Sequence, residues 1–248
     1  MNSYRLNPDI IEKLSYYVYL YINPIDNRIF YVGKGKGNRV FEHLKSNSET
    51  RVAQIVKEIQ ANGQNPLIEI LAHGLPNEDT AYKIEAAVID VIGVDNLANA
   101  VRGWRSGFYG RMDIKQLVSL YHKERVEIDE PAILIKLIWS YHYGMSEAEL
   151  YDGTRGVWKL SNRRNSAKYA FAVYEGIVRE VYEIQQWFPA GSTFNSRDPE
   201  GQELREYSDR WEFIGRVAAS EVRNKYLLKS VEHYFGEYSR SPITYVNC

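Results

Sequence analysis

The segment from Tyr16 to Ile22 alternates tyrosine with aliphatic residues, and this alternation constrains the fold more than any other feature. A period of two is typical of a β-strand whose two faces differ. The turn-forming run 23–27 (NPIDN) follows, and the strand pattern resumes from Arg28 to Val32. The two segments therefore predict a β-hairpin. Its first strand places the hydroxyl-bearing rings on one face, those of Tyr17, Tyr19 and Tyr21.

Helices and a further strand are predicted after the hairpin. A glycine- and lysine-rich loop occupies 33–37, and a short helical stretch runs from 38 to 45. Ser48 is a suitable N-cap for a helix that ends near Ala61, with Gly63 as its stop. Residues 67–72 are predicted as a third strand, and a helix runs from about Asn77 to Gly93. This order predicts a small α/β layer with a mostly antiparallel three-stranded sheet.

The composition changes in the stretch 103–112 (GWRSGFYGRM), where glycine, arginine and aromatic residues cluster and regular periodicity ends. We therefore expect two domains, residues 1–111 and residues 112–248, in an α+β protein. The second domain is predicted to be mostly β with flanking helices. Helices are predicted at 113–123, after the capping box formed by Ser146 and Glu149, and at 220–235, and an apolar run occupies 132–139. Strands are predicted at 168–174, 177–187, 211–217 and 243–246, with a tight turn at Glu175-Gly176.

The composition excludes several classes of protein. The 248 residues contain a single cysteine, Cys248, which excludes a disulfide framework and a thiolate zinc site. No apolar run approaches the ~20 residues that cross a bilayer, and the first ten residues lack the apolar centre of a signal peptide. We therefore expect a cytoplasmic protein with no membrane partner. Because 31 basic and 32 acidic side chains give a net charge of −1, any positive field that attracts nucleic acid must be local.

One carboxylate lies in an unexpected place on the predicted helix 77–93. Glu85 falls inside an apolar stripe along this helix. The stripe consists of Ala81, Ile84, Val88, Val91 and Ile92. A carboxylate within an apolar face is costly unless a cation accompanies it. A divalent metal ion and a buried arginine are both such partners, and the residues alone leave the two alternatives open.

Cationic side chains follow the predicted hairpin. Glycines in the 33–37 loop would let backbone N–H groups approach an anionic oxygen, and Lys34 and Lys36 add positive charge. A solvated basic turn is the alternative. Arg39 and His43 stand four residues apart, hence on one face of the predicted helix. A guanidinium beside an imidazole can serve a phosphate and a proton transfer together, although such pairs also occur on solvent-exposed helices.

These residues, taken in order, resemble the GIY-YIG nuclease family. Tyr17-Val18-Tyr19 stands at the first signature triplet, with Tyr17 in place of the glycine, and Tyr31-Val32-Gly33 stands at the second. The run FYVGKGKGNRVFEHL is most similar to the branch found in LEM-domain-associated nucleases and their bacterial relatives. The resemblance covers about residues 16–105.

The resemblance implies a site and a reaction. The activity would be metal-dependent endonucleolytic hydrolysis of phosphodiester bonds with one divalent ion, Mg²⁺, for which Mn²⁺ could substitute. Arg39 would donate to the phosphate and Glu85 would be the metal ligand. Asn99, rather than the competing Asn96, would close the domain. The implied catalytic residues are Tyr19, Tyr31, Lys34, Arg39, His43, Glu85 and Asn99.

The proton transfer in this reaction requires a base. A tyrosine has an ordinary pKa of about 10, whereas histidine, at about 6.5, is better matched to neutral pH. We hypothesise that Tyr19 contacts the attacking water and that His43 accepts its proton. Tyr31 would then position the water or the phosphate.

The second domain carries no comparable constellation of metal ligands or nucleophiles. Its segments Arg155–Trp158, Tyr169–Trp187 and Arg210–Gly215 are similar in pattern to small PUA-like barrels, modules associated with recognition of nucleic acids and modified bases. Such a domain would select the substrate. The side chains predicted to contact nucleic acid in the two domains are those of Lys36, Arg163, Arg164 and Lys168.

The expected substrate is DNA, with RNA as an alternative, in repair, restriction of foreign DNA or a mobile element. A second hypothesis is a nucleic-acid-binding protein that uses the nuclease scaffold without cutting. A third is an α/β protein whose motif matches arise by chance. Because one active site cuts one strand, cleavage of both strands would need a dimer or two successive events.

Overall fold

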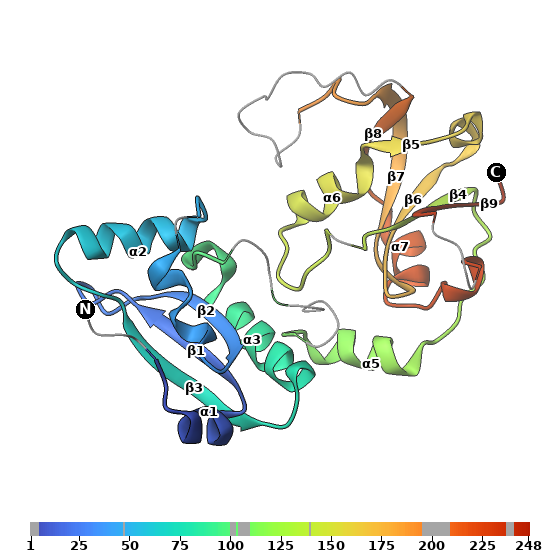
Figure 1. Cartoon of the computed structure of the whole chain (residues 1–248). Coiled ribbons are helices and arrows are strands. Elements are labelled where there is room, and N and C mark those ends of the chain that lie inside the picture. The colour runs from blue at the N-terminus through green and yellow to red at the C-terminus, as the bar shows by residue number, and fades with distance from the viewer. Residues whose placement is uncertain are drawn as a thin grey trace. The chain divides into compact units, whose positions relative to one another are not determined.

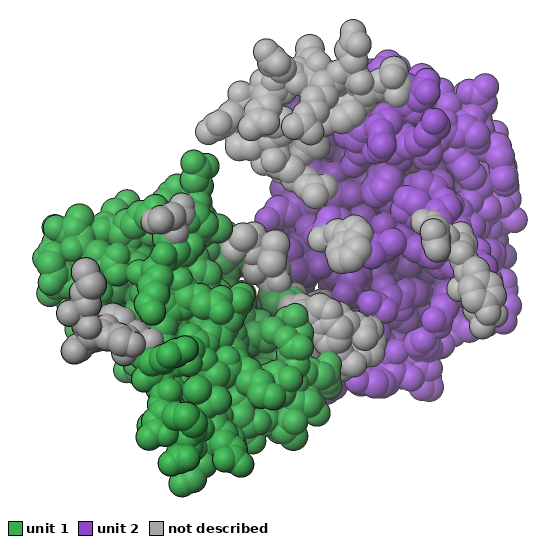
Figure 2. Space-filling view, in the orientation of Figure 1, with its two compact units in different colours: residues 1–111 green, residues 112–248 purple. Residues whose placement is uncertain are grey.

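The chain divides into two compact units, Met1–Arg111 (unit 1) and Met112–Cys248 (unit 2), shown in Figure 2. The structure, a computed structural model, describes residues 5–46, 48–99, 103, 110–138, 140–194, 209–236 and 241–248. Most of the segment 103–112, at which we predicted the change of domain, lies outside the described residues. The predicted α+β class is confirmed, since both units combine a sheet with helices (Figure 1). None of the described helices has the length and hydrophobicity needed to cross a membrane.

Unit 1 is built on a three-stranded antiparallel sheet of order β2-β1-β3 (Figure 1). Its described elements are α1 (Pro8–Leu14), β1 (Tyr16–Ile22), β2 (Ile29–Lys36), the 3₁₀ turns η1 (Arg39–Phe41) and η2 (His43–Lys45), α2 (Arg51–Ala61), β3 (Leu67–Leu75), α3 (Glu78–Ile92) and η3 (Val94–Asn96). The predicted hairpin is β1 and β2.

The two faces of the central strand β1 pack into two different cores, as its alternation predicts. The tyrosine face packs with α2 and the 3₁₀ turns, and its three tyrosines are at most 1% exposed. Val18, Leu20 and Ile22 on the other face pack against α3. The sheet is therefore a layer with helical structure on both faces, and the tyrosine hydroxyls are directed to the side of η1 and η2.

Two glycines of β2 make room for two tyrosines of β1. Gly35 lies opposite Tyr17, and Gly33 lies opposite Tyr19. A Cβ atom at Gly33 would come within 2.6 Å of the Tyr19 Cζ atom, and one at Gly35 within 2.9 Å of the Tyr17 Cζ atom. The rings therefore lie across the glycine backbones, as aromatic side chains often do in neighbouring strands. The predicted 33–37 loop is wrong, because the strand continues to Lys36.

Helix boundaries in unit 1 agree with the sequence where a cap is made. Asn77 caps α3 through its side chain, and Gly93, with a φ of +89°, ends it. α2 begins at Arg51 rather than near Ser48, because the Ser48 hydroxyl bonds that of Thr50 instead of a helix N–H. The predicted helix 38–45 is instead the two 3₁₀ turns, and α1 was not predicted.

Unit 2 is a six-stranded sheet of order β5-β8-β7-β6-β4-β9. Its described elements are α5 (Ile114–His122), β4 (Ala132–Lys136), α6 (Glu147–Arg155), β5 (Trp158–Lys159), η4 (Asn162–Ser166), β6 (Tyr169–Tyr174), β7 (Ile177–Pro189), β8 (Arg210–Val217), α7 (Ser220–Tyr226), η5 (Glu232–Tyr234) and β9 (Ile243–Val246). Neighbouring strands are antiparallel except β4 and β6, which are parallel. α6 and α7 pack against opposite faces of this sheet (Figure 1).

Local predictions in unit 2 are largely confirmed. Ser146 and Glu149 form the predicted capping box of α6. Glu175 and Gly176, with φ values of +51° and +74°, form the tight turn between β6 and β7. The predicted helix 220–235 is wrong after Tyr226, because Leu228 adopts a φ of +62° that an α-helix does not allow. The PUA-like resemblance stays a prediction.

Candidate active site

Two of the predicted tyrosines and the predicted histidine form a hydrogen-bonded chain in unit 1. The side chain of Tyr19 is hydrogen-bonded to that of Tyr31. The Tyr31 hydroxyl lies 3.2 Å from Nε2 of His43. The two rings of this second pair meet edge to face at 5.0 Å. β1, β2 and η2 each contribute one member, so the chain exists only once the sheet and the turn have packed together.

The other two tyrosines on the same face of β1, Tyr17 and Tyr21, bond the backbone instead. The Tyr17 hydroxyl donates to the Gly37 carbonyl at 2.8 Å and accepts from the Val40 N–H at 3.1 Å. The Tyr21 hydroxyl donates to the Val40 carbonyl. Both hydroxyls therefore hold the chain at η1. Only Tyr19 directs its hydroxyl to the chain with Tyr31.

Burial disfavours the ionised form of Tyr19. Desolvation, together with the neighbouring phenols, raises the pKa of Tyr19 far above its ordinary value. Burial and the Glu85 carboxylate also raise the pKa of Tyr31. The hydrogen bond with Tyr19 and the charges of Arg39 and Lys34 partly lower it. A phenolate is therefore less costly at Tyr31 than at Tyr19.

His43 is held as a neutral acceptor. Burial, followed by the charge of Arg39, lowers the pKa of His43 below its ordinary value. A neutral imidazole can take a proton at Nε2, where the Tyr31 hydroxyl lies. The hydrogen-bond partner of His43 is therefore Tyr31, and not Tyr19, which we hypothesised to contact the attacking water.

The outer edge of β2 is closed by side chains and loop backbone instead of another strand. Val32 donates its N–H to Oδ1 of Asn99 at 3.1 Å, and Nδ2 of Asn99 donates to the Val32 carbonyl at 2.7 Å. The Ala98 N–H donates to the carbonyl of Phe30. The Lys34 N–H donates to Oε1 of Glu85 at 3.1 Å. Every second residue of an edge strand points its backbone N–H and C=O groups away from the sheet. The outward groups of Val32 and Lys34 therefore fix Asn99 and Glu85 beside Tyr31.

The competing asparagine has a local role. Asn96 donates its Nδ2 to the Ile92 carbonyl at 2.8 Å and so completes the C-terminus of α3. The structure therefore brings Asn99, and not Asn96, to β2.

Glu85 is a carboxylate with spare acceptor capacity. Burial raises its pKa, whereas the charge and the N–H of Lys34 lower it in part. Among the described residues, no arginine forms an ion pair with this carboxylate, and it is not part of a group of three His, Cys, Asp or Glu side chains. A half-buried carboxylate that accepts one backbone hydrogen bond retains lone pairs for a hard cation. The residue therefore fits a metal ion held mainly by water and substrate oxygens.

The two predicted phosphate-binding cations are paired with carboxylates that sequence reasoning missed. Nη1 of Arg39 lies 2.5 Å from Oε2 of Glu42, and the pair is largely exposed. Nζ of Lys34 lies 2.5 Å from Oε1 of Glu78 and 3.8 Å from the centre of the Tyr82 ring. The spacing of Arg39 and Glu42, three residues apart, was the signal for the first pair.

The predicted α3 stripe contains one exception. Val91 is 75% exposed, because the buried face of α3 includes Ala86 and Ile89, from which position 91 is turned away at 100° per residue.

The predicted basic patch of unit 2 is wrong for Arg164. Its guanidinium is buried, stacks 3.5 Å from the centre of the Trp211 ring and donates to the Ser161 carbonyl. Arg163 donates to the Cys248 carbonyl and so ties η4 to the end of the chain. Lys168 is exposed. These three side chains therefore do not form one surface array.

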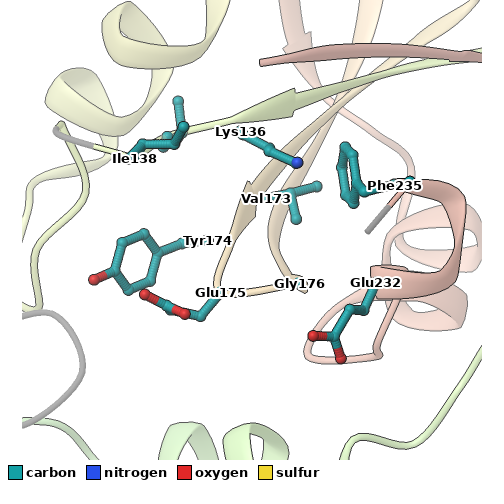
Figure 3. A pocket seen from close by; sticks show the side chains of 10 residues that line it. Lys136, Ile138, Val173, Tyr174, Glu175, Gly176, Glu232 and Phe235 are labelled. Carbon is teal, nitrogen blue, oxygen red and sulfur yellow. The ribbon is translucent and has the colours of Figure 1, made fainter. Parts of the chain in front are cut away.

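Unit 2 contains a hollow of about 570 Å³ at the turn between β6 and β7 (Figure 3). Val173 and Leu137 supply apolar atoms to its wall, and Phe235 lies 4.2 Å, at its ring centre, from Nζ of Lys136. Glu175 extends beside Tyr174, on the side of the turn away from Phe235 (Figure 3). The lining of this hollow therefore combines an aromatic ring with charged groups of both signs.

The sheet of unit 1 thus brings two tyrosines and a histidine together, with Glu85 at the neighbouring edge of β2. Residues 6–120, just under half of the chain, match the family model described as the LEM-3-like GIY-YIG domain. This match supports a GIY-YIG nuclease domain in this part of the chain. No curated protein and no solved structure matched the chain.

Proposed function

We propose that this protein is a Mg²⁺-dependent DNA endonuclease in which unit 1 cuts and unit 2 selects the substrate. The observation that carries the proposal is the hydrogen-bonded chain from Tyr19 through Tyr31 to His43 in a GIY-YIG domain. Such a chain supplies a route for a proton, which hydrolysis by water requires.

Glu85 is the residue that would hold the metal ion. When bound, Mg²⁺ would stabilise negative charge on the phosphate and on the leaving oxygen. Burial raises the pKa of Glu85, which supports this role, because a buried carboxylate gains most from a cation.

Tyr31 is the better candidate to contact the attacking water. Its hydroxyl accepts a hydrogen bond from Tyr19 and lies beside the imidazole of His43. Tyr31 would pass its proton to Nε2 of His43 as it takes one from water. Tyr19, which is buried, would orient Tyr31.

Arg39 and Lys34 would bind the phosphate by exchanging partners. Each now pairs with an exposed carboxylate, Glu42 and Glu78 respectively. The Arg39–Glu42 pair is exposed on both sides, and such pairs are weak, so a phosphate can displace Glu42 from Arg39 at low cost.

Unit 2 would select the substrate through the hollow beside Phe235 and Lys136. Aromatic side chains next to donors and acceptors can stack and read a base. The support for this role is the lining of the hollow, and the nuclease domain in unit 1 does not depend on it.

The test is cleavage of plain, branched, flapped and base-modified DNA, and of RNA, with Mg²⁺ or with a chelator. We expect metal-dependent cleavage of DNA that falls by about 10²–10³-fold in Glu85→Gln. Glu58→Gln, which changes an exposed carboxylate of α2, is the matched control. Undiminished cleavage in Glu85→Gln would refute the proposal, and tight metal-independent binding without cleavage would favour the non-cutting alternative.

A further inference from the structure

A hollow of about 470 Å³ lies beside η1 and η2 in unit 1. Its wall, here called the basic groove, includes Arg5, Lys36, Arg39, Phe41, Glu42 and Lys45. Four of these six side chains are cations and one is a carboxylate. We propose that the basic groove binds the sugar–phosphate backbone of the nucleic-acid strand next to the phosphate that is cut. This inference rests on the proposed function and extends it to the substrate path.

The groove is assembled from separate parts of the chain. Asn38, after the end of β2, accepts the Leu6 N–H at Oδ1 over 2.7 Å, which holds the segment before α1 against this turn. This contact brings Arg5 to the other residues of the basic groove, which lie about thirty or more positions later in the sequence. Lys36 ends β2, with its Nζ 5.0 Å from the centre of the Tyr16 ring, and Lys45 ends η2.

The charge of the basic groove is only partly compensated. Glu42 pairs with Arg39. Within the described parts of the chain, no ion pair joins a carboxylate to Arg5, Lys36 or Lys45. Three exposed cations in one hollow create a local positive field in a chain whose net charge is −1. A polyanion with regularly spaced charges fits such a surface better than a single small anion.

Arg39 connects the basic groove to the active site. Its guanidinium lines the groove, and its charge also acts on His43 and Tyr31. η1 and η2, which carry Arg39 and His43, therefore form the boundary between the two. A strand whose phosphate lies at Tyr31 would place neighbouring phosphates along this boundary. Phe41 adds an aromatic surface on which a sugar or an unpaired base can rest.

The experiment measures binding apart from cutting. The full-length protein with Glu85→Gln is titrated, without metal, with a fluorescent mixed-sequence DNA duplex over a range of salt concentrations. The test variant adds Arg5→Ala and Lys45→Ala. The control adds Arg28→Ala and Lys57→Ala, which remove the same charges from exposed positions outside the groove. We expect the test variant to bind roughly tenfold more weakly, with a slope of log K against log salt smaller by about two.

The conservative and reversed variants sharpen the result. Lys45→Arg should bind as the parent does, and Lys45→Glu should bind more weakly than Lys45→Ala. If the double alanine variant does not fold, Arg5→Gln with Lys45→Gln replaces it. Equal affinity and equal salt slope in test and control would overturn the inference while leaving cleavage by the wild type intact. Weaker binding by the test variant in a protein that never cuts would support the basic groove and refute the proposed hydrolysis.

Discussion

The three tyrosines on one face of β1, Tyr17, Tyr19 and Tyr21, show how one residue type takes different roles according to the partner of its hydroxyl group. Tyr17 and Tyr21 bond the backbone at Gly37 and Val40, whereas Tyr19 bonds Tyr31. The same strand face therefore contains two structural tyrosines and one that reaches the site. Gly33 permits this arrangement, because a Cβ atom there would clash with the Tyr19 ring.

The protonation of His43 sets an expected pH dependence. The base must be neutral, and burial and Arg39 lower the pKa of His43 below its ordinary value of about 6.5. Activity should therefore rise with pH through this lowered pKa and stay high at neutral pH. Ionisation of Glu85 contributes a separate acid limb, since burial raises its pKa from 4.5.

The measurement is the pH profile of kcat/KM for the wild type and for His43→Gln. We expect the variant to lose about 10²–10⁴-fold in rate and to lose one of the two acid limbs. His73→Gln, an exposed histidine of β3, should retain the wild-type profile. A profile of unchanged shape in His43→Gln would remove this histidine from the proton transfer.

At the scale of elements, the edge of β2 is the feature that assembles the site. An open edge strand presents unpaired backbone groups, which proteins usually cover. Here Asn99, the Ala98 N–H and Glu85 cover it. The carboxylate that fits a metal ion is thus part of the same edge that keeps the sheet closed.

Asn99 should contribute to stability as well as to the site. Asn99→Ala removes two hydrogen bonds to Val32 and leaves both backbone groups without that partner. We expect a loss of about 2–3 kcal/mol in the free energy of unfolding. Asn96→Ala, which removes one exposed bond to the Ile92 carbonyl, should cost less than about 1 kcal/mol. Urea denaturation monitored in both variants checks this, and equal losses would contradict the role of Asn99.

For the whole molecule, the match to the family model and the division into units do not coincide. The model match reaches residue 120 and so includes most of α5, whereas the compact units divide at residue 111. α5 thus belongs to the family pattern by sequence and to unit 2 by its contacts. Cutting and selection are accordingly properties that we assign to different units and test separately.

The selection role of unit 2 predicts a change in discrimination. Phe235→Ala removes the ring beside Lys136 in the hollow. We expect the ratio of kcat/KM between the best and the poorest DNA substrate to fall about tenfold, since stacking on one base contributes about 1–3 kcal/mol. Tyr121→Ala, which truncates an exposed ring of α5, should leave this ratio unchanged. An equal loss on every substrate in Phe235→Ala would argue against selection by this hollow.

The sequence by itself determined the elements whose causes are local. The alternation in β1, the caps of α3 and the capping box of α6 each depend on residues within one turn or one strand. Order along the chain also predicted the site residues of the family motif. The sequence could not predict the parallel pairing of β4 and β6, because this pairing depends on a crossover connection between the two strands. It also could not predict that Arg164 is buried against Trp211.

Only the tertiary structure decided which groups meet. His43 contacts Tyr31 rather than Tyr19, Asn99 reaches β2 while Asn96 stays on its own helix, and Arg5 joins a wall with Lys45. These contacts join residues far apart in the sequence, or select between neighbours of the same chemical type. The spacing of residues along the chain does not predict these contacts, because the packing of the sheet, the turns and the edge of β2 determines the distances between the side chains.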